Sequence, residues 1–234
     1  MAKITVIFPT YNEKENITKL ILGVRQLINP FEIIVVDDNS PDKTWKIVQK
    51  LASKYDNIRL IKRINKRGLA SAISDGIISS KGDIVVWMDC DFSMPLETIP
   101  SLIKALGKSQ IAIGSRYVKG GNDEREFSRV ITSKLFNTFA SLVLGRSIKD
   151  YTTGFVAAKR EVFDTLDLYG VYGEYCVIFL CKAKEQGIKI LEVPYTCIPR
   201  TQGETKTADN FFNLLKHGLN YGVAVIKLWL NRGV

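Results

Sequence analysis

The stretch Asp83-Ile84-Val85-Val86-Trp87-Met88-Asp89-Cys90-Asp91 is an apolar run that ends in two aspartates separated by one residue. A continuous apolar run of this length is typical of a parallel strand that is covered on both faces of its sheet. In open α/β sheets, ligands bind beyond the carboxyl ends of such strands. Asp89 and Asp91 suit Mg²⁺ or Mn²⁺ there, with substrate phosphates as further ligands. An acidic loop whose charge is absorbed by hydrogen bonds is the alternative.

Similar apolar runs alternate with segments of helical periodicity over the first half of the chain. We expect strands at 3–8, 31–36, 58–61, 84–88 and 111–114, and helices at 17–28, 44–51, 68–79 and 96–106. This order predicts βαβ units and a mostly parallel, doubly wound α/β sheet. Right-handed crossovers would place the C-terminal end of every strand on one edge. Beyond it we expect a mobile loop at 119–127, helices at 131–143 and 176–185, and strands at 152–158 and 190–195.

Polar and acidic residues follow three of these expected strands. They are Asn12 and Glu13, Asp37 and Asp38, and Asp89 and Asp91. On one edge of one sheet they would form a cleft for the base, ribose and metal-bound phosphates of a nucleotide. A dinucleotide-binding fold would need GxGxxG after a strand, but the first turn reads Pro-Thr-Tyr-Asn-Glu. In a receiver domain the acidic pair follows the first strand, whereas here it follows the second.

The composition indicates a globular protein with an anionic partner. The 234 residues carry a net charge of +9, which favours nucleic acid, acidic lipid or a phosphorylated substrate. Basic residues interleaved with stacking aromatics would mark nucleic-acid binding, and that pattern is missing from the sequence. The four cysteines form no CxxC pair, and with one histidine they give no zinc spacing. With no secretory leader and no apolar stretch of membrane-spanning length, we expect a cytoplasmic location.

Three segments resemble the nucleotide-sugar motifs of family 2 glycosyltransferases, which have the GT-A, Rossmann-like fold. They are VIFPTYNE at 6–13, VVDDNSPDKT at 35–44 and MDCD at 88–91. Three more are similar to the dolichyl-phosphate mannose synthase branch, namely DFSMPLE at 91–97, GSRYVKGG at 114–121 and RTQGETK at 200–206. The resemblance covers nearly all of a catalytic domain at 1–207. It implies transfer of mannose from GDP-mannose to dolichyl or another polyprenyl phosphate, with inversion and with Mg²⁺ or Mn²⁺.

The resemblance also implies roles for individual positions. Asp91, Arg116 and Arg200 would be catalytic, and Asp89 and Asp91 would bind the metal. The donor and acceptor would be held by Pro9, Tyr11, Glu13, Val36, Asp38, Asp89, Cys90, Ser93, Arg116, Arg129, Arg200 and Lys206. Two positions depart from the pattern: Met94 stands where relatives often have histidine, and a glutamate expected near Ile178 is missing.

The chemistry of a lipid phosphate agrees with these assignments. A monophosphate has a second pKa of about 6, so it is already an oxyanion nucleophile at neutral pH and needs no general base. Arginine suits the site because its planar fork matches phosphate oxygens. Two alternatives stay open: another donor such as UDP-glucose on the same lipid, and a non-catalytic nucleotide-binding module on the membrane.

The segment 208–234 carries an apolar stripe beside the basic residues Lys216 and His217, formed by Phe211, Phe212, Leu215 and Leu219. Such a pattern is typical of an amphipathic helix in the membrane interface, and packing on the body or in a dimer is the alternative. Anionic headgroups would add about 1 kcal/mol per nearby Lys or Arg. We therefore expect a peripheral protein on the cytoplasmic face of a membrane, and a membrane-anchoring partner subunit is a further open expectation.

Overall fold

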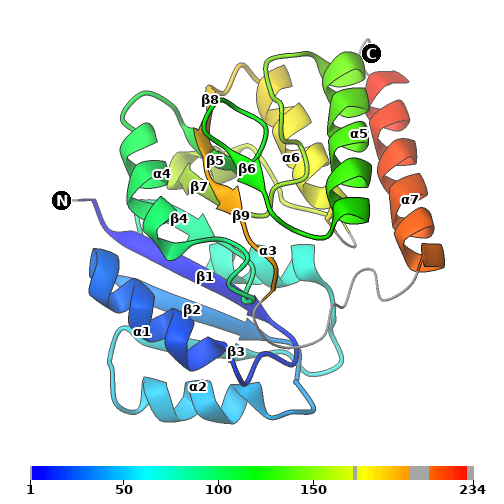
Figure 1. The fold of residues 1–234 in the computed structure, drawn as a ribbon. Helices are drawn as coiled ribbons and strands as arrows, with labels where there is room; N and C mark the ends of the chain where they lie inside the picture. The colour runs from blue at the N-terminus through cyan, green and yellow to red at the C-terminus, as the bar shows by residue number, and fades with distance from the viewer. Residues whose placement is uncertain (1, 171–172, 201–210, 231–234) are drawn as a thin grey trace.

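A twisted sheet of seven strands forms the centre of the molecule (Figure 1). The computed structural model describes residues 2–170, 173–200 and 211–230, and within 211–220 it describes the backbone. The strand order is β3-β2-β1-β4-β7-β5-β8. The strands are β1 (Ile4–Thr10), β2 (Glu32–Asp37), β3 (Ile58–Lys62), β4 (Ile84–Trp87), β5 (Ile111–Ser115), β7 (Val156–Lys159) and β8 (Ile190–Pro194).

The predicted mostly parallel sheet is confirmed, with one exception. β7 pairs antiparallel with both β4 and β5, whereas the other pairs in this sheet are parallel. The expectation that every strand ends on one edge is therefore wrong for β7. The chain re-enters the sheet at the edge where β4 and β5 end, because Val156 at the start of β7 pairs with Trp87 and Ile113. Apolar periodicity does not encode this connection.

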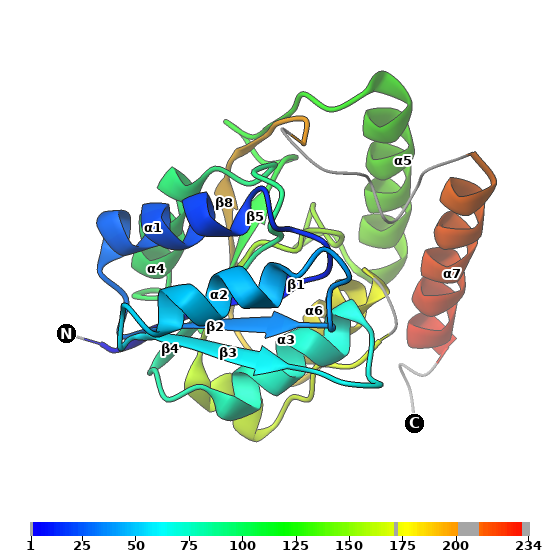
Figure 2. The same ribbon diagram turned by 90° about the horizontal axis from the view of Figure 1, so that it is seen from below.

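Helices cover both faces of the sheet (Figure 2). One face carries α1 (Ile17–Ile28), α2 (Thr44–Ala52), and α4 (Ile99–Ala105) with the 3₁₀ turn η1 (Leu96–Thr98). The other carries α3 (Leu69–Ser79), α5 (Phe127–Leu144), α6 (Glu174–Glu185) and α7 (Phe211–Leu230), with the 3₁₀ turn η2 (Arg160–Asp164) after β7. The sheet thus separates two hydrophobic cores.

Strand β1 shows why the apolar runs are continuous. Val6 and Phe8 pack in the core under α1, whereas Ile7 packs in the core under α3, because successive side chains point to opposite faces. In β4, Trp87 is fully buried and its ring lies 5.8 Å from that of Phe179. Packing on both faces anchors β4, so the residues that follow it emerge at a defined point.

The expected mobile loop at 119–127 is instead tied to the body. Its short strand β6 (Asn122–Asp123) pairs with β9 (Thr196–Cys197). The Glu124 amide also donates to the Cys197 carbonyl at 2.8 Å. α5 then begins at Phe127, four residues before the start that the sequence predicts. This pairing joins segments about seventy residues apart, so local sequence carries no sign of it.

Helix α7 is the described part of the segment 208–234, and it packs on α5 and α6. The rings of Tyr221 and Phe136 are 5.0 Å apart, and Val225 is fully buried. Among the helices of the described residues, none is both long enough and apolar enough to cross a bilayer.

Candidate functional site

The candidate site lies where β1, β2 and β4 end. β1 stands between β2 and β4 in the sheet, so the loops that leave these strands meet at one edge. This is the kind of position where open α/β sheets bind ligands. The Cys90 thiol lies 3.4 Å from the Pro9 carbonyl oxygen, which joins the loop after β4 to the end of β1. The structure therefore brings these two predicted site residues together.

Buried hydrogen bonds fix the loops after β1 and β2. Asp37 is fully buried and accepts from the hydroxyls of Thr10, at 2.8 Å, and Ser40, at 2.7 Å. The Glu13 amide donates to the Thr44 hydroxyl at 2.9 Å, so the start of α1 is held against the start of α2. Asp37 is thus a structural residue, and the donor-site role of its neighbour Asp38 stays a prediction.

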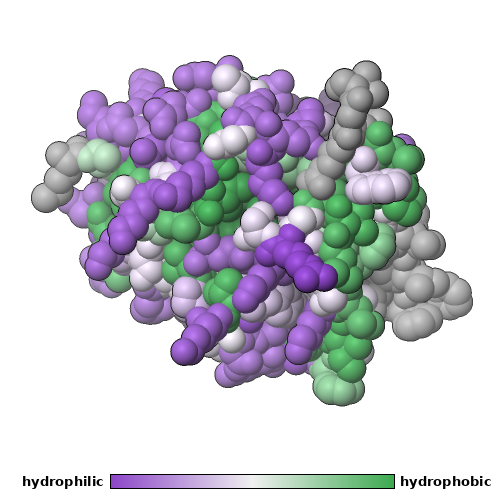
Figure 3. Space-filling model, turned by 90° about the horizontal axis from the view of Figure 1, so that it is seen from above, coloured by the Kyte–Doolittle hydropathy of each residue, from purple (hydrophilic) through white to green (hydrophobic). Residues whose placement is uncertain are grey.

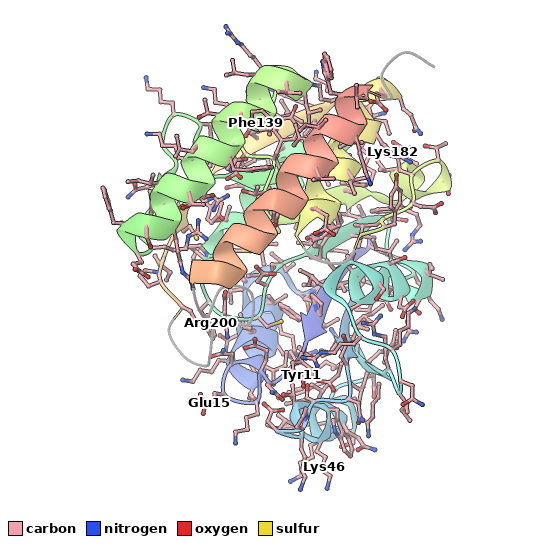
Figure 4. The ribbon with its side chains drawn as sticks, turned by 90° about the vertical axis from the view of Figure 1, so that its right-hand side faces the viewer. Tyr11, Glu15, Lys46, Phe139, Lys182 and Arg200 are labelled. Carbon is pink, nitrogen blue, oxygen red and sulfur yellow. The ribbon has the colours of Figure 1, made fainter. Side chains whose placement is uncertain are left out.

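Arg200 links two of the predicted acidic site residues. Its Nη2 lies 3.2 Å from Glu13 Oε1, and its Nε lies 3.3 Å from Asp91 Oδ2. The Arg200 side chain is 19% exposed, whereas Glu13 is buried. In Figure 4, Arg200 lies below the lower end of α7, with Tyr11 on the strand side of it. A guanidinium at this point compensates two carboxylates that come from different strand ends.

The turn that contains Asp91 also explains how Arg200 reaches it. Asp91 Oδ1 accepts from the Ser93 amide at 3.0 Å and from its hydroxyl at 2.6 Å. The Ser93 carbonyl in turn accepts from the Ile198 amide at 3.1 Å. The segment after β9 is thereby fastened to the turn, two residues before Arg200. Ser93, predicted as a donor-site residue, orients Asp91.

Asp89 points toward Gly154 and Tyr175. A Cβ atom placed on Gly154 would lie 3.5 Å from both Asp89 Oδ1 and the Tyr175 hydroxyl oxygen. Burial raises the pKa of Tyr175 well above its ordinary value, and the negative charge of Asp89 adds to the effect. Tyr175 therefore stays a neutral phenol beside Asp89, and its hydroxyl accepts from the Trp87 indole at 3.2 Å.

The residues at this edge fit a divalent ion that is completed by substrate. Within the described residues, no group of three or more Asp, Glu, His or Cys side chains gathers into a metal cage. Mg²⁺ typically uses one or two carboxylates together with substrate phosphates rather than such a cage. Asp91, which already pairs with a cation in Arg200, and Asp89 provide hard oxygen ligands of this kind. Their role as metal ligands stays a prediction.

The residues predicted to bind the nucleoside differ in their burial and in their contacts. Tyr11 is half-buried, and the Arg67 guanidinium lies over its ring at 3.7 Å. The Val36 side chain is fully buried in the core, and its carbonyl oxygen accepts from the Thr10 hydroxyl at 3.5 Å. Asp38 is held by Arg63, whose Nε donates to Asp38 Oδ1 at 2.6 Å. Sequence reasoning missed Arg63 and Arg67, although a basic loop directly after the third strand is a readable signal.

Arg116 has a different environment from Arg200. Its Nε and Nη2 donate to the two carboxylate oxygens of Asp150 at 2.8 and 2.7 Å, and Nη2 also donates to the Thr152 hydroxyl at 2.7 Å. Asp123 lies 3.5 Å from Nη1. Burial lowers the pKa of Arg116, yet the charge and hydrogen bonds of Asp150 raise it well above its ordinary value. The predicted contact with substrate phosphates is not visible in these bonds, and Asp150 and Asp123 were not predicted.

Two further predicted residues and one departure from the family pattern remain. Arg129 is in the first turn of α5, and its amide donates to the Glu126 carbonyl at 2.9 Å. Lys206 lies outside the described residues. Met94, at the position where histidine was expected, is buried in the core under α1.

Comparison with known proteins identifies a family and relatives that agree with the resemblance seen in the sequence. A family model described as Glycosyl transferase family 2 matches residues 5–167. Over 222 residues the chain is 40% identical to a dolichol-phosphate mannosyltransferase of Pyrococcus furiosus, covering 92% of this chain and 62% of that relative. It is 35% identical over 210 residues to a polyprenol monophosphomannose synthase of Mycolicibacterium smegmatis, covering 86% and 79% of the two chains. The chain thus spans less than two thirds of the P. furiosus relative.

A solved structure confirms the predicted GT-A fold. Glucosyl-3-phosphoglycerate synthase of Mycobacterium tuberculosis, in complex with Mn²⁺, UDP and glucosyl-3-phosphoglycerate, superposes with a TM-score of 0.73 at 20% identity. The match covers 97% of this chain and 80% of that one. At this identity the likeness concerns the architecture of the sheet and its helices.

Proposed function

Since the chain belongs to glycosyltransferase family 2, we propose that it transfers mannose from GDP-mannose to dolichyl or another polyprenyl phosphate, with inversion at the anomeric carbon. The observation that carries the proposal is the placement of Arg200 across Glu13 and Asp91 at the edge where β1 and β4 end. The 40% identical relative named a dolichol-phosphate mannosyltransferase supports this choice of substrates.

The donor lies along the strand ends in this proposal. Tyr11 and Asp38 bind the guanosine, and Asp89 and Asp91 hold Mg²⁺ or Mn²⁺ on the diphosphate. A bound divalent ion supplies Lewis-acid stabilisation of the leaving diphosphate. Ser93 keeps the Asp91 carboxylate in one orientation through its amide and hydroxyl, so that the other carboxylate oxygen faces Arg200.

Arg200 neutralises negative charge on the two anionic substrates in this proposal. It already compensates two carboxylates, and its partly exposed fork can turn toward phosphate oxygens when these carboxylates acquire other partners. The lipid phosphate attacks the anomeric carbon directly because it is ionised at neutral pH, with a second pKa of about 6. The side chains therefore position and neutralise, and no proton transfer to the enzyme is required. Lys206 and Arg129 are proposed to hold the acceptor phosphate.

The outer faces of α5 and α7 suit an acceptor that is embedded in a membrane. Figure 3 shows hydrophobic residues gathered on the side of the molecule where these helices lie. The exposed apolar side chains there are Phe127, Ile131, Leu135, Phe139 and Leu142 on α5, and Val223, Ile226, Trp229 and Leu230 on α7. Exposed apolar patches of this kind mark interaction surfaces, and the chain carries a net charge of +9. We place the protein peripherally on the cytoplasmic face of a membrane. An anchoring partner subunit remains compatible with this placement.

A direct assay tests the proposal. Purified protein is incubated with Mn²⁺, a polyprenyl phosphate in detergent, and either GDP-mannose or UDP-glucose. We expect a mannosyl lipid and GDP from the first donor, and no product when the lipid lacks its phosphate. Glucosyl lipid from UDP-glucose alone would replace the proposed donor. Nucleotide binding without product from either donor would favour the non-catalytic alternative.

A further inference from the structure

Arg63, directly after β3, is enclosed by hydrogen-bond acceptors at the base end of the site. Its side chain is 3% exposed. Nη1 donates to the Ser71 hydroxyl at 2.8 Å and to Asp75 Oδ2 at 3.1 Å, and Nη2 donates to the Gly68 carbonyl at 2.9 Å. Nε and Nη2 both face Asp38 Oδ1, at 2.6 and 2.5 Å. This guanidinium is therefore fixed in place and not available to a substrate.

Asp38 is fixed from both of its oxygens. Besides the bonds from Arg63 to Oδ1, Oδ2 accepts from the Gly68 amide at 2.9 Å. Gly68 has φ +145°, a backbone conformation that side chains other than glycine rarely adopt, and it directly precedes α3. The Asp38 side chain is 7% exposed, so solvent contributes little to its orientation.

The charges around this pair explain why Arg63 is needed. Without Arg63, Asp38 would be a nearly buried carboxylate held by one amide, and Asp75 would keep Lys66, at 2.8 Å, as its cation. A buried carboxylate that loses its charged partner is costly and either takes up a proton or turns toward water. Either change removes the oriented acceptor that Asp38 presents at the edge of the sheet.

We propose that Arg63 is a positioning residue that fixes Asp38 as the group that reads the nucleotide base, so that base discrimination depends on a residue that does not touch the donor. The inference rests on the proposed assignment of Asp38 to the nucleoside. Discrimination arises where a buried polar group of the site is left unpaired by the wrong ligand. Such a penalty requires the carboxylate to be held in one orientation, as Arg63 and Gly68 hold it.

Calorimetry tests the proposal by measuring how tightly each protein binds its ligands in the presence of Mn²⁺. The ligands are GDP, inosine diphosphate (IDP), UDP and pyrophosphate, and the proteins are wild type, Arg63→Lys and Arg63→Gln. For the preferred nucleotide we expect affinity to fall about tenfold, the value of one hydrogen bond to a charged group. Pyrophosphate affinity should stay unchanged, because the diphosphate site lies on other strands. The ratio of affinities between preferred and rejected bases should fall by the same factor.

Arg59 provides a matched control on the same strand. It pairs with Glu32 at 2.9 Å in β3 rather than at the end of that strand, and the pair is not part of the site. Arg59→Gln should leave base discrimination unchanged even where it lowers the melting temperature. Gly68→Ala perturbs the other oxygen of Asp38 and should reduce discrimination in the same direction, which gives a second test if the Arg63 variants do not fold.

The outcomes separate this inference from the proposed function. A wild type that binds every nucleotide no better than pyrophosphate would contradict both. A wild type that prefers UDP would contradict the proposed donor but not the positioning role of Arg63. In that case, loss of the UDP preference in Arg63→Lys would still support the positioning role. Base preference that survives in both Arg63→Lys and Gly68→Ala, or an equal loss of pyrophosphate binding, would overturn the positioning role of Arg63.

Discussion

Arg116 and Arg200 were predicted from equally good motif resemblance, yet the structure places them in opposite environments. Arg116 is buried and makes two short bonds to Asp150, which is itself fully buried. Arg200 is 19% exposed and makes two longer contacts, to the carboxylates of Glu13 and Asp91, which are themselves predicted to bind substrate or metal. A motif identifies the residue, whereas its surroundings decide whether its charge is committed to the fold or available to a ligand.

The difference leads to opposite expectations for mutation. Around Arg116, a matched set of charges is closed off from water, so removing one member leaves another unpaired. Around Arg200, the contacts are partly solvated and contribute little to stability. The Arg116 region should therefore respond to mutation in folding, and the Arg200 region in catalysis.

The largest effect is expected for Asp91→Asn. Loss of one ligand to the proposed metal removes several kcal/mol of transition-state stabilisation, so turnover should fall about 10⁴-fold. Initial rates of mannosyl-lipid formation measure this, with circular dichroism as a check on the fold. Asp56→Asn, at an exposed acid just before β3, serves as the control and should keep wild-type rates. Full activity of the Asp91 variant would place the ion elsewhere.

Arg116→Met should cost about 3–5 kcal/mol of unfolding free energy, because Asp150 and Asp123 stay buried without their shared cation. Urea unfolding followed by tryptophan fluorescence measures the loss. Under the same conditions Arg200→Met should change stability by less than about 1 kcal/mol. Similar losses in the two variants would erase the contrast between the regions.

Arg200→Lys should lower turnover about 100-fold while leaving the melting temperature near that of wild type. An ammonium group is a point charge and does not reproduce the planar, two-pronged contact of a guanidinium with phosphate oxygens. Steady-state kinetics with varied lipid phosphate give the measurement. A variant with unchanged kinetics would show that Arg200 serves only to hold Glu13 and Asp91 together.

About half of the fold could be predicted from local sequence. The helix at 17–28 begins and ends as α1 does, and the first five strands lie within two residues of the expected bounds, because burial on both faces produces long apolar runs. The antiparallel β7 and the pairing of β6 with β9 depend on contacts between distant segments. These leave no periodic trace in either partner.

In the site too, the residues that follow apolar strands could be predicted, whereas their partners from distant positions could not. Asp38, Asp89 and Asp91 could be found because they directly follow apolar strands. The partners that determine their behaviour come from distant positions, as with Arg63 for Asp38 and Asp150 for Arg116. The bonds of Arg116 to Asp150 in particular set it apart from Arg200, and no local pattern in the sequence indicates them. Sequence therefore identified the acidic groups and Arg200, and missed Arg63, Arg67, Asp123 and Asp150, which contact other predicted site residues.

Charge on the outer faces of α5 and α7 should weaken membrane association. Leu135 is 67% exposed and Trp229 is 54% exposed, so replacing both by glutamate removes apolar area and adds repulsion from anionic lipid without disturbing the core. We expect about tenfold weaker co-sedimentation with vesicles that contain anionic lipid. Ile78→Glu, at an exposed apolar residue of α3, is the control and should bind as wild type does. Equal binding of all three proteins would exclude these faces.

The smallest effect concerns pH and the Arg116 region. Burial raises the pKa of Asp123, but bonds and charge from Arg125, and the charge of Arg116, lower it overall below the ordinary value of 3.8. A carboxyl whose folded-state pKa is lowered contributes stability above its unfolded-state pKa and loses it as pH falls through the folded value. Melting temperatures between pH 5 and pH 2.5, about the range where carboxyls titrate, should fall less steeply for Asp123→Asn than for wild type. Parallel curves would remove Asp123 from the charge cluster.

The central claim is that Asp89 and Asp91 hold a divalent ion together with the donor diphosphate. Electron paramagnetic resonance of Mn²⁺, titrated with and without GDP, tests it most directly because free and bound Mn²⁺ give different signals. We predict that GDP tightens Mn²⁺ binding in wild type and in Asp56→Asn, and that this gain is lost in Asp89→Asn and Asp91→Asn. Undiminished tightening by GDP in both of the latter variants would contradict the account.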